Sequence, residues 1–239
     1  MGSNEFPLRY TALLVGDEAM KCISEARVIL FGVGGVGSWC AESLIRSGIR
    51  YLTIVDPDTI QPTNINRQLP ATTQTIGQAK VDVLKTRLSA INSEAYITAI
   101  QRVYNAKTTD SFDLSSYHYI IDAIDSLEDK IHLIRTATRT QATFFSSMGA
   151  ALKINPSKIQ VAEFWKVYGC PLAAALRKKL RQGTLPSKKF LCVFSDELLE
   201  NKDNSFSVVR KANNKGSIVH ITAIFGFTLA GLVIQDLCQ

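Results

Sequence analysis

Two short apolar runs near the start of the chain are separated by a helical pattern. Residues 27–32 form a β-rich run that stops at a glycine, and the apolar residues from Ser38 to Ser47 recur at helical spacing. Residues 50–56 form a second apolar run, which ends in an acid. This order predicts a strand, a tight turn, a helix and a second, parallel strand joined by a right-handed crossover.

The same alternation continues to residue 147. A loop rich in Pro, Thr, Gln and Asn at 57–76 precedes a helical pattern at 77–92. Further strands are expected at 95–101, 118–122 and 142–147, and a further helix at 127–140. We therefore predict an α/β fold with a doubly wound, mainly parallel Rossmann-like sheet that binds ligands at the carboxyl ends of its strands.

The pattern changes after Gly149. Two short strands on either side of Asn155-Pro156 predict a hairpin over 150–163. A basic helix at 170–181, a partly mobile Lys/Asn/Ser-rich stretch to 215 and an apolar helix at 217–236 are expected to follow. This divides the chain into residues 1–148, an N-terminal segment plus a Rossmann-like domain, and residues 149–239, a basic extension of antiparallel strands and helices in one continuous globular unit.

The last of these segments also tests whether the protein is soluble. Residues 218–234 are almost wholly apolar, but they include His220, Gly226 and Gly231 and fall short of the roughly 20 residues that span a bilayer. We interpret them as a buried or interface helix, with membrane association as the weaker alternative.

The composition is that of a globular protein without disulfide bonds or a zinc site. The hydrophobic content of 46% and the charged content of 20% are those of a globular protein. The five cysteines are widely spaced and include no Cys-x-x-Cys pair, so neither a disulfide framework nor a zinc site is predicted. No basic and apolar secretory signal opens the sequence, which favours a cytoplasmic location.

The net charge of +6 is unevenly distributed. Residues 166–215 hold eleven lysines and arginines against four acids, a net charge of +7. This excess predicts that a polyanion docks on the C-terminal part of the chain. The candidate nucleic-acid contacts are Arg177, Lys178, Lys179, Arg181, Lys188 and Lys189.

A glycine-rich turn follows the first predicted strand and opens the first helix. Such a turn lets backbone N–H groups approach a phosphate at the positive end of the helix. The turn residues expected to bind it are Gly32, Gly34, Gly35, Val36 and Gly37. Asp56 would accept the ribose hydroxyls. The turn alone does not distinguish NAD, FAD and ATP, and Gly35 could instead serve close helix packing.

Polar residues downstream favour ATP. Asn64, Arg67 and Gln68 lie in the predicted loop and Lys80 lies at a helix start. An arginine suits bidentate contact with phosphate oxygens and a lysine suits point-charge neutralisation, although each alone is often a solvated surface charge. Their joint position after the same βαβ unit predicts a triphosphate site.

Carboxylates also follow the strand at 118–122. Asp122, Asp125 and Ser126 lie where the ligand crevice is expected. Asp125, beyond the strand, is the better ligand for the Mg²⁺ that accompanies ATP. For Asp122 the favoured role is to cap the strand or orient the loop, although it is kept among the ATP contacts.

These motifs occur in the order typical of the ubiquitin-activating and ThiF/MoeB-type adenylating enzymes, which residues 27–148 resemble. Later segments resemble the tRNA threonylcarbamoyladenosine dehydratase family within that superfamily. They are Ile159-Gln-Val161, Pro171-Leu-Ala-Ala174, Cys192-Val-Phe-Ser195 and Thr222-Ala-Ile-Phe-Gly-Phe227.

The resemblance implies ATP-dependent dehydration, with cyclisation, of N6-threonylcarbamoyladenosine next to the tRNA anticodon through carboxylate activation. Arg67 and Lys80 would steady the phosphates and Asp125 would hold Mg²⁺. It also implies a homodimer, for which residues 218–234 are the candidate interface, and allows a sulfur-transfer protein partner. An arginine that relatives lend to the neighbouring subunit could be Arg9, although its spacing differs from the family pattern.

Two alternatives stay open. The first is an adenylyltransferase for the C-terminus of a sulfur-carrier or ubiquitin-like protein, which the absent cysteine pairs disfavour. The second is an ATP-binding scaffold without turnover. Four further residues are interpreted as structural, namely Trp39, His118, His132 and Cys192.

Overall fold

The computed structural model describes residues 8–202 and 215–239. Their strands form one seven-stranded sheet in the order β3-β2-β1-β4-β5-β7-β6, in which β6 alone is antiparallel to its neighbour. The strands are β1 (Arg27–Phe31), β2 (Tyr51–Val55), β3 (Tyr96–Ile100), β4 (Tyr119–Asp122), β5 (Thr143–Ser147), β6 (Ile159–Glu163) and β7 (Leu191–Ser195). The predicted Rossmann-like sheet is confirmed.

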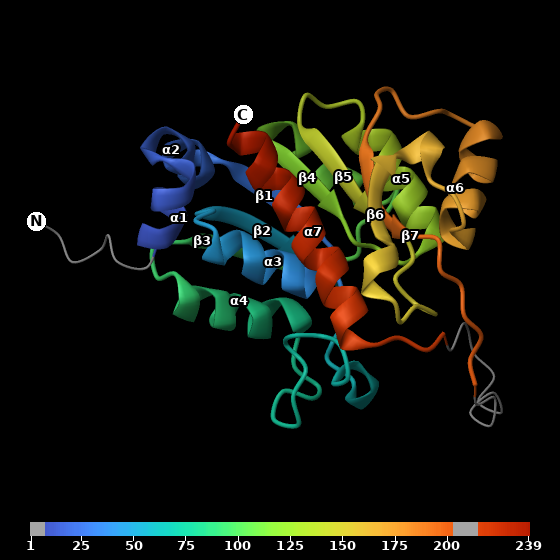
Figure 1. The fold of residues 1–239 in the computed structure, drawn as a ribbon, viewed down its shortest axis with the longest axis horizontal. Coiled ribbons are helices and arrows are strands. Elements are labelled where there is room, and N and C mark those ends of the chain that lie inside the picture. Colours follow the sequence, from blue (N-terminus) through green and yellow to red (C-terminus); the bar gives the residue numbers. More distant parts are fainter. Residues whose placement is uncertain (1–7, 203–214) are drawn as a thin grey trace, which may run out of the picture.

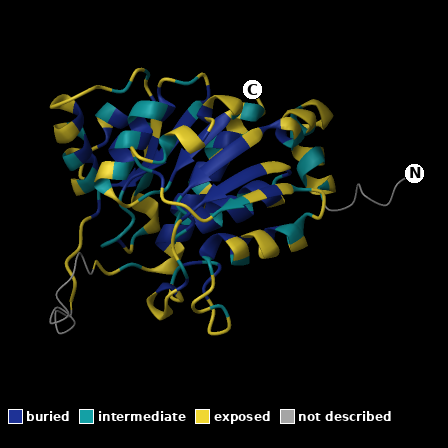
Figure 2. Cartoon of the chain, turned by 180° about the vertical axis from the view of Figure 1, so that it is seen from behind, coloured by how far each residue is buried: buried dark blue, intermediate teal, exposed yellow. Residues whose placement is uncertain are grey.

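Helices cover both faces of the sheet (Figure 1, Figure 2). The helices are α1 (Arg9–Val15), α2 (Asp17–Glu25), α3 (Gly37–Arg46), α4 (Lys80–Ile91), α5 (Leu127–Ala137), α6 (Pro171–Arg181) and α7 (Val219–Leu237). Side chains of α2, α3, α4 and α7 share one hydrophobic cluster, and those of α5 and α6 share the other. The molecule is therefore a three-layer α/β/α arrangement.

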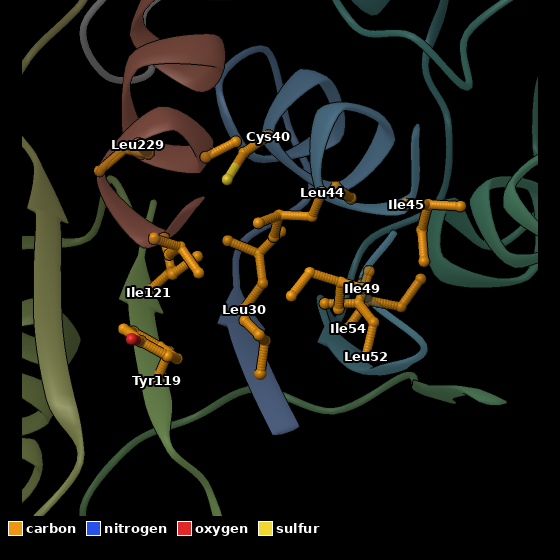
Figure 3. Close-up of a cluster of buried hydrophobic side chains, with 14 of the residues drawn as sticks. Leu30, Cys40, Leu44, Ile45, Ile49, Leu52, Ile54, Tyr119, Ile121 and Leu229 are labelled. Carbon is orange, nitrogen blue, oxygen red and sulfur yellow. The ribbon is translucent and has the colours of Figure 1, made fainter. Parts of the chain in front are cut away.

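Strand β1 shows why both faces must be covered. Val28 and Leu30 belong to the first cluster, whereas Ile29 and Phe31 belong to the second. Successive side chains of a strand point to opposite faces, so a continuous apolar run needs helices on both sides. Figure 3 shows Leu30 of β1 beneath α3, between side chains of the neighbouring strands β4 and β2, with Leu229 of α7 on the same side.

Helix α7 packs across α3 because one of its residues lacks a side chain. A Cβ at Gly226 would lie 2.4 Å from the Val36 carbonyl oxygen, so only glycine permits this crossing. By length and composition α7 could cross a membrane, but such helices also occur in soluble cores. Eight of its residues are buried against the rest of the chain, which confirms the prediction of a buried helix.

One sequence prediction for the C-terminal part is wrong, and one strand there was missed. The hairpin over 150–163 does not form, because β6 pairs with β7 instead of with residues 150–154. Those residues form a loop in which Ile154 and Asn155 donate their N–H groups to the Glu197 carboxylate. The stretch expected to be partly mobile contains the buried strand β7, and its residues 203–214 lie outside the described residues. Helices α1 and α2 were not predicted.

Candidate functional site

The glycine turn connects β1 to α3 at the carboxyl edge of the sheet. Gly32 has a φ of +85°, and a Cβ there would lie 2.6 Å from the Ala123 carbonyl oxygen. A Cβ at Gly37 would lie 1.8 Å from the Gly32 carbonyl oxygen. These two glycines serve the chain's own packing. A Cβ at Gly34 would meet only the Gln68 amide, at 3.6 Å, so the bare backbone at this point can admit a ligand.

Gly35 lies against the loop and α7. A Cβ there would come within 3.2 Å of the Arg67 side chain and 3.3 Å of Thr222. Close packing, the alternative considered from the sequence, is therefore part of its role.

Asp56 follows β2 and is only 5% exposed. Its Oδ2 accepts the Val33 N–H at 2.8 Å, and its Oδ1 accepts the Asp58 N–H at 2.9 Å. Burial raises the pKa of this carboxyl, and the nearby Lys80 opposes that rise. Asp56 thus holds the glycine turn in place, a role that the sequence did not reveal. Each oxygen retains a lone pair that could accept a ribose hydroxyl.

Two amides of the following loop have different surroundings. The Asn64 Oδ1 accepts the Gln61 N–H at 3.0 Å and so closes the short 3₁₀ turn Pro62–Asn64. Gln68 is 7% exposed, and its buried Oε1 has no hydrogen-bond partner among the described residues. Buried polar atoms normally have partners, so this amide beside Gly34 marks a place for a ligand.

Arg67 anchors the loop with its backbone and leaves its guanidinium near the surface. The Arg67 carbonyl accepts the Trp39 indole N–H at 3.1 Å, and the guanidinium donates to the Thr63 carbonyl and to the Asn66 amide oxygen. Asn66 in turn donates to the Ser217 carbonyl at 2.9 Å, which brings the chain just before α7 to this loop. Trp39 therefore positions the loop as well as packing.

Lys80 opens α4 and is 6% exposed. Its Nζ lies 2.8 Å from the Asp58 carboxylate and 3.8 Å from that of Asp56. The structure thus brings the ammonium group to the end of β2, beside Asp56, which holds the glycine turn.

The two carboxylates after β4 have opposite surroundings. Asp122 is fully buried, and its Oδ2 accepts hydrogen bonds from Lys130 Nζ at 2.8 Å and from Ser146 Oγ at 2.7 Å. Its Oδ1 accepts the Ile124 N–H at 3.0 Å. Asp122 has no surface left for a ligand, so its place among the predicted ATP contacts is corrected to that of a loop-orienting residue.

Asp125 and Ser126 are exposed at the start of α5. The structure gives the Asp125 carboxylate no hydrogen bond or ion pair within the described residues, so its oxygens are free to bind Mg²⁺. Over residues 8–202 and 215–239, no three His, Cys, Asp or Glu side chains gather into a metal-binding group.

The basic residues of the C-terminal part divide into two sets. Arg177 donates to the carbonyls of Phe164 and Val167, and Lys188 donates to those of Thr140 and Ala142. These two cations therefore hold the chain's own loops. The remaining four are exposed, namely Lys178, Lys179, Arg181 and Lys189. Of these, Lys179 pairs with Glu128 and Arg181 lies over the Trp165 ring at 5.4 Å.

The residues interpreted as structural have structural surroundings. The His118 Nδ1 accepts the Arg27 N–H at 3.1 Å. His132 lies beside the Tyr104 ring, and burial lowers its pKa. Cys192 is fully buried in β7, and burial raises the pKa of its thiol well above the ordinary value. A thiol kept protonated is a poor nucleophile, so packing is the role that this position supports.

Comparison with known proteins identifies the family of this chain. Residues 9–239 match the ThiF family. The chain is 36% identical to the tRNA threonylcarbamoyladenosine dehydratase of Bacillus subtilis, with 95% of this chain and 92% of the relative covered. It is 34% identical to the Escherichia coli enzyme of the same name, with 95% and 91% covered.

Solved structures show the same relationship. The E. coli tRNA N6-threonylcarbamoyladenosine dehydratase TcdA in complex with ATP superposes with a TM-score of 0.89 at 32% identity, covering 99% of this chain and 96% of that one. Its complex with AMP gives a TM-score of 0.88. The chain belongs to the ThiF family and, within it, to the tRNA threonylcarbamoyladenosine dehydratases.

Proposed function

We propose that this protein catalyses the ATP-dependent dehydration of N6-threonylcarbamoyladenosine in tRNA, closing it to a cyclic form. The observation that carries the proposal is the carboxyl edge of the sheet. The open backbone at Gly34, the Arg67 guanidinium, the Lys80 ammonium and the Asp125 carboxylate all lie on segments that leave this edge. The chain presents them within a sequence that matches dehydratases over nearly its full length.

Carboxylate activation explains why ATP is needed. A free carboxylate is a poor electrophile, so the substrate's threonyl carboxylate would first attack the α-phosphate of ATP and release pyrophosphate. The substrate's own carbamoyl nitrogen would then attack the activated carbonyl carbon and displace AMP. Because this nucleophile is tethered to the electrophile, proximity supplies much of the rate and the chain needs no cysteine nucleophile.

The surroundings of each residue suggest its role in binding ATP. The backbone from Gly34 to Gly37 would receive the phosphates, Asp56 the ribose and Gln68 a polar group of the nucleotide. Arg67 and Lys80 would stabilise the charge that develops on the phosphates. Asp125 would hold Mg²⁺, which neutralises phosphate charge when it is bound.

The test is a mass measurement on the product nucleoside. Purified protein, ATP, Mg²⁺ and tRNA bearing the linear modification should yield a nucleoside lighter by one water, together with AMP. Arg67→Ala should abolish the change while the protein keeps its fold, whereas Lys85→Ala, an exposed residue on α4, should not. No mass change with the unaltered protein at saturating ATP would contradict the proposal.

A second experiment locates the tRNA. The four exposed cations Lys178, Lys179, Arg181 and Lys189 form a candidate phosphate-binding surface. Replacing Lys178 and Lys189 by Gln should weaken tRNA binding and reduce the slope of log affinity against log salt by about one for each phosphate that is no longer neutralised. Lys85→Gln is the matched control, because α4 covers the opposite face of the sheet. Equal slopes would place the tRNA elsewhere.

The homodimer, the cytoplasmic location and the sulfur-transfer partner are further parts of the proposal.

The homodimer has support on helix α1. This helix has no buried residue, and it leaves Tyr10, Leu13 and Leu14 at least 73% exposed, as expected of a surface that another chain covers. Arg9 opens the same helix and stays a candidate for a residue lent to a second copy. Sedimentation of Leu13→Glu against the unaltered protein would test the dimer.

A further inference from the structure

The Lys80 ammonium has two carboxylates in reach, and the structure holds them differently. Both oxygens of Asp56 accept backbone N–H groups, and its side chain is 7% exposed. The Asp58 side chain is 63% exposed, and Lys80 is its partner among the described residues, at 2.8 Å. The Asp56 carboxylate is thus fixed in place by the backbone, whereas the Asp58 carboxylate can leave Lys80 and be solvated by water.

The backbone of Asp58 is fixed on both sides even though its side chain is exposed. Its N–H donates to Asp56 Oδ1 at 2.9 Å, and its carbonyl accepts the Lys80 N–H at 3.1 Å. The next residue, Thr59, forms a bridge with Ala79. The Asp58 carboxylate is therefore held beside the Lys80 amine by a rigid backbone and can move only by side-chain rotation.

A triphosphate that approaches Lys80 meets this carboxylate. The Asp58 charge repels phosphate and occupies a donor of the amine that phosphate would use. We propose that Asp58 is a positioning residue, an exchangeable counterion that orients Lys80 and yields it to the phosphates of ATP. This rests on the proposed function only in assuming that ATP phosphates engage Lys80.

The exchange predicts an effect on ATP binding. Asp58→Asn removes the competing charge, so ATP should bind about twofold to fivefold more tightly, the range expected from an exposed ion pair. Because the carboxylate has left the amine in the ATP complex, kcat should be unchanged while the KM for ATP falls. Asp58→Glu keeps the competing charge, so its affinity for ATP should stay close to that of the unaltered protein. A residue that only supported the fold would weaken ATP binding when replaced.

Calorimetric titration of ATP with Mg²⁺, without tRNA, tests this directly. The variants are Asp58→Asn, Asp58→Glu, Lys80→Gln and the double variant Asp58→Asn with Lys80→Gln. The matched control is Asp82→Asn. It removes an exposed acid from the first turn of α4, the helix that Lys80 opens, and leaves the Lys80 side chain unchanged. The proposal expects tighter binding for Asp58→Asn alone, with no gain in the Lys80→Gln background or in the control.

Any other pattern of ATP affinities among these variants overturns it. An unchanged or weaker ATP affinity for Asp58→Asn means that Asp58 does not compete for Lys80. An equal gain in the Lys80→Gln background or in Asp82→Asn means that the charge acts at long range and not through the amine. ATP binding by the unaltered protein without dehydration of tRNA contradicts the proposed function alone, whereas no ATP binding at all contradicts both.

Discussion

Two lysine–aspartate pairs lie at the same carboxyl edge of the sheet, and they have different surroundings. Lys130 and Asp122 are 2.8 Å apart after β4, and both side chains are fully buried. Lys80 and Asp58 are also 2.8 Å apart, after β2, but the aspartate side chain is 63% exposed. The two pairs therefore have the same distance but different roles. The Lys130–Asp122 pair holds a loop, whereas Lys80 can exchange Asp58 for another anion.

The cost of breaking each pair follows from this difference. A buried charge that loses its partner keeps its full desolvation penalty, whereas an exposed one regains water. Stability measurements should therefore respond to the first pair, and ATP measurements to the second.

The largest effect is expected for the buried pair. Lys130→Met leaves the Asp122 carboxylate without its ammonium partner and should lower the free energy of unfolding by about 3–5 kcal/mol. Urea denaturation followed by circular dichroism measures the loss, and Lys85→Met is the exposed-lysine control. If Lys130→Met does not fold, Asp122→Asn offers the milder version of the same change. A loss below about 1 kcal/mol in both would contradict the structural role of this pair.

The open pair should show the reverse pattern. Lys80→Gln should cost less stability than Lys130→Met, because Asp58 is solvated without its partner and both Asp56 oxygens keep their backbone N–H partners. Turnover should fall about 100-fold to 1,000-fold, as for removal of one group that stabilises developing charge. Single-turnover kinetics at saturating ATP measures this. Near-normal turnover would exclude Lys80 from the phosphate contacts.

Glu42 forms two ion pairs, whose exposure is intermediate between those of the two lysine–aspartate pairs. The Glu42 side chain is 8% exposed and meets Arg87 at 2.6 Å and Arg46 at 2.9 Å, while both arginines are largely exposed. Burial opposes ionisation of Glu42, but hydrogen bonds from Arg87 and Arg46 hold its pKa below the ordinary 4.5.

The direction of its pH dependence follows from that lowered pKa. The stabilising contribution is complete above the ordinary value and is lost as the pH falls through the lower, folded-state value. Glu42→Gln should therefore cost about 1–2 kcal/mol at neutral pH and flatten the loss of stability below pH 4.5. Thermal unfolding of both proteins from about pH 3 to about pH 7, a range that includes the ordinary pKa of a carboxyl group, checks this, and parallel curves would refute it.

The smallest effect is expected for the exposed Asp125. Asp125→Asn should leave stability unchanged and raise the Mg²⁺ concentration for half-maximal turnover about tenfold, because a neutral amide oxygen binds the cation less well. A magnesium titration at fixed ATP gives the value. The control is Asp82→Asn, which removes an exposed acid on α4. An unchanged magnesium requirement would remove Asp125 from the predicted metal site.

What could be predicted from the sequence follows the range of the interactions. The βαβ unit at 27–56 was predictable because a strand, a turn and a helix each leave a local pattern. The pairing of β6 was not, because its partner β7 lies about thirty residues away and the two strands carry no turn signal between them. The hairpin was predicted from Asn155-Pro156, which instead opens a 3₁₀ turn.

By itself, the sequence determined the doubly wound order of elements, the family and the chemical types gathered at the strand ends. Only the tertiary structure decided which of those residues face a ligand. Asp122 and Asp125 are three positions apart, and the sequence favoured Asp125 for the metal but kept both among the ATP contacts; in the structure one is fully buried against Lys130 and the other is exposed. Burial depends on neighbours from distant parts of the chain, so the same residue type can hold the fold at one strand end and remain available to ATP at the next.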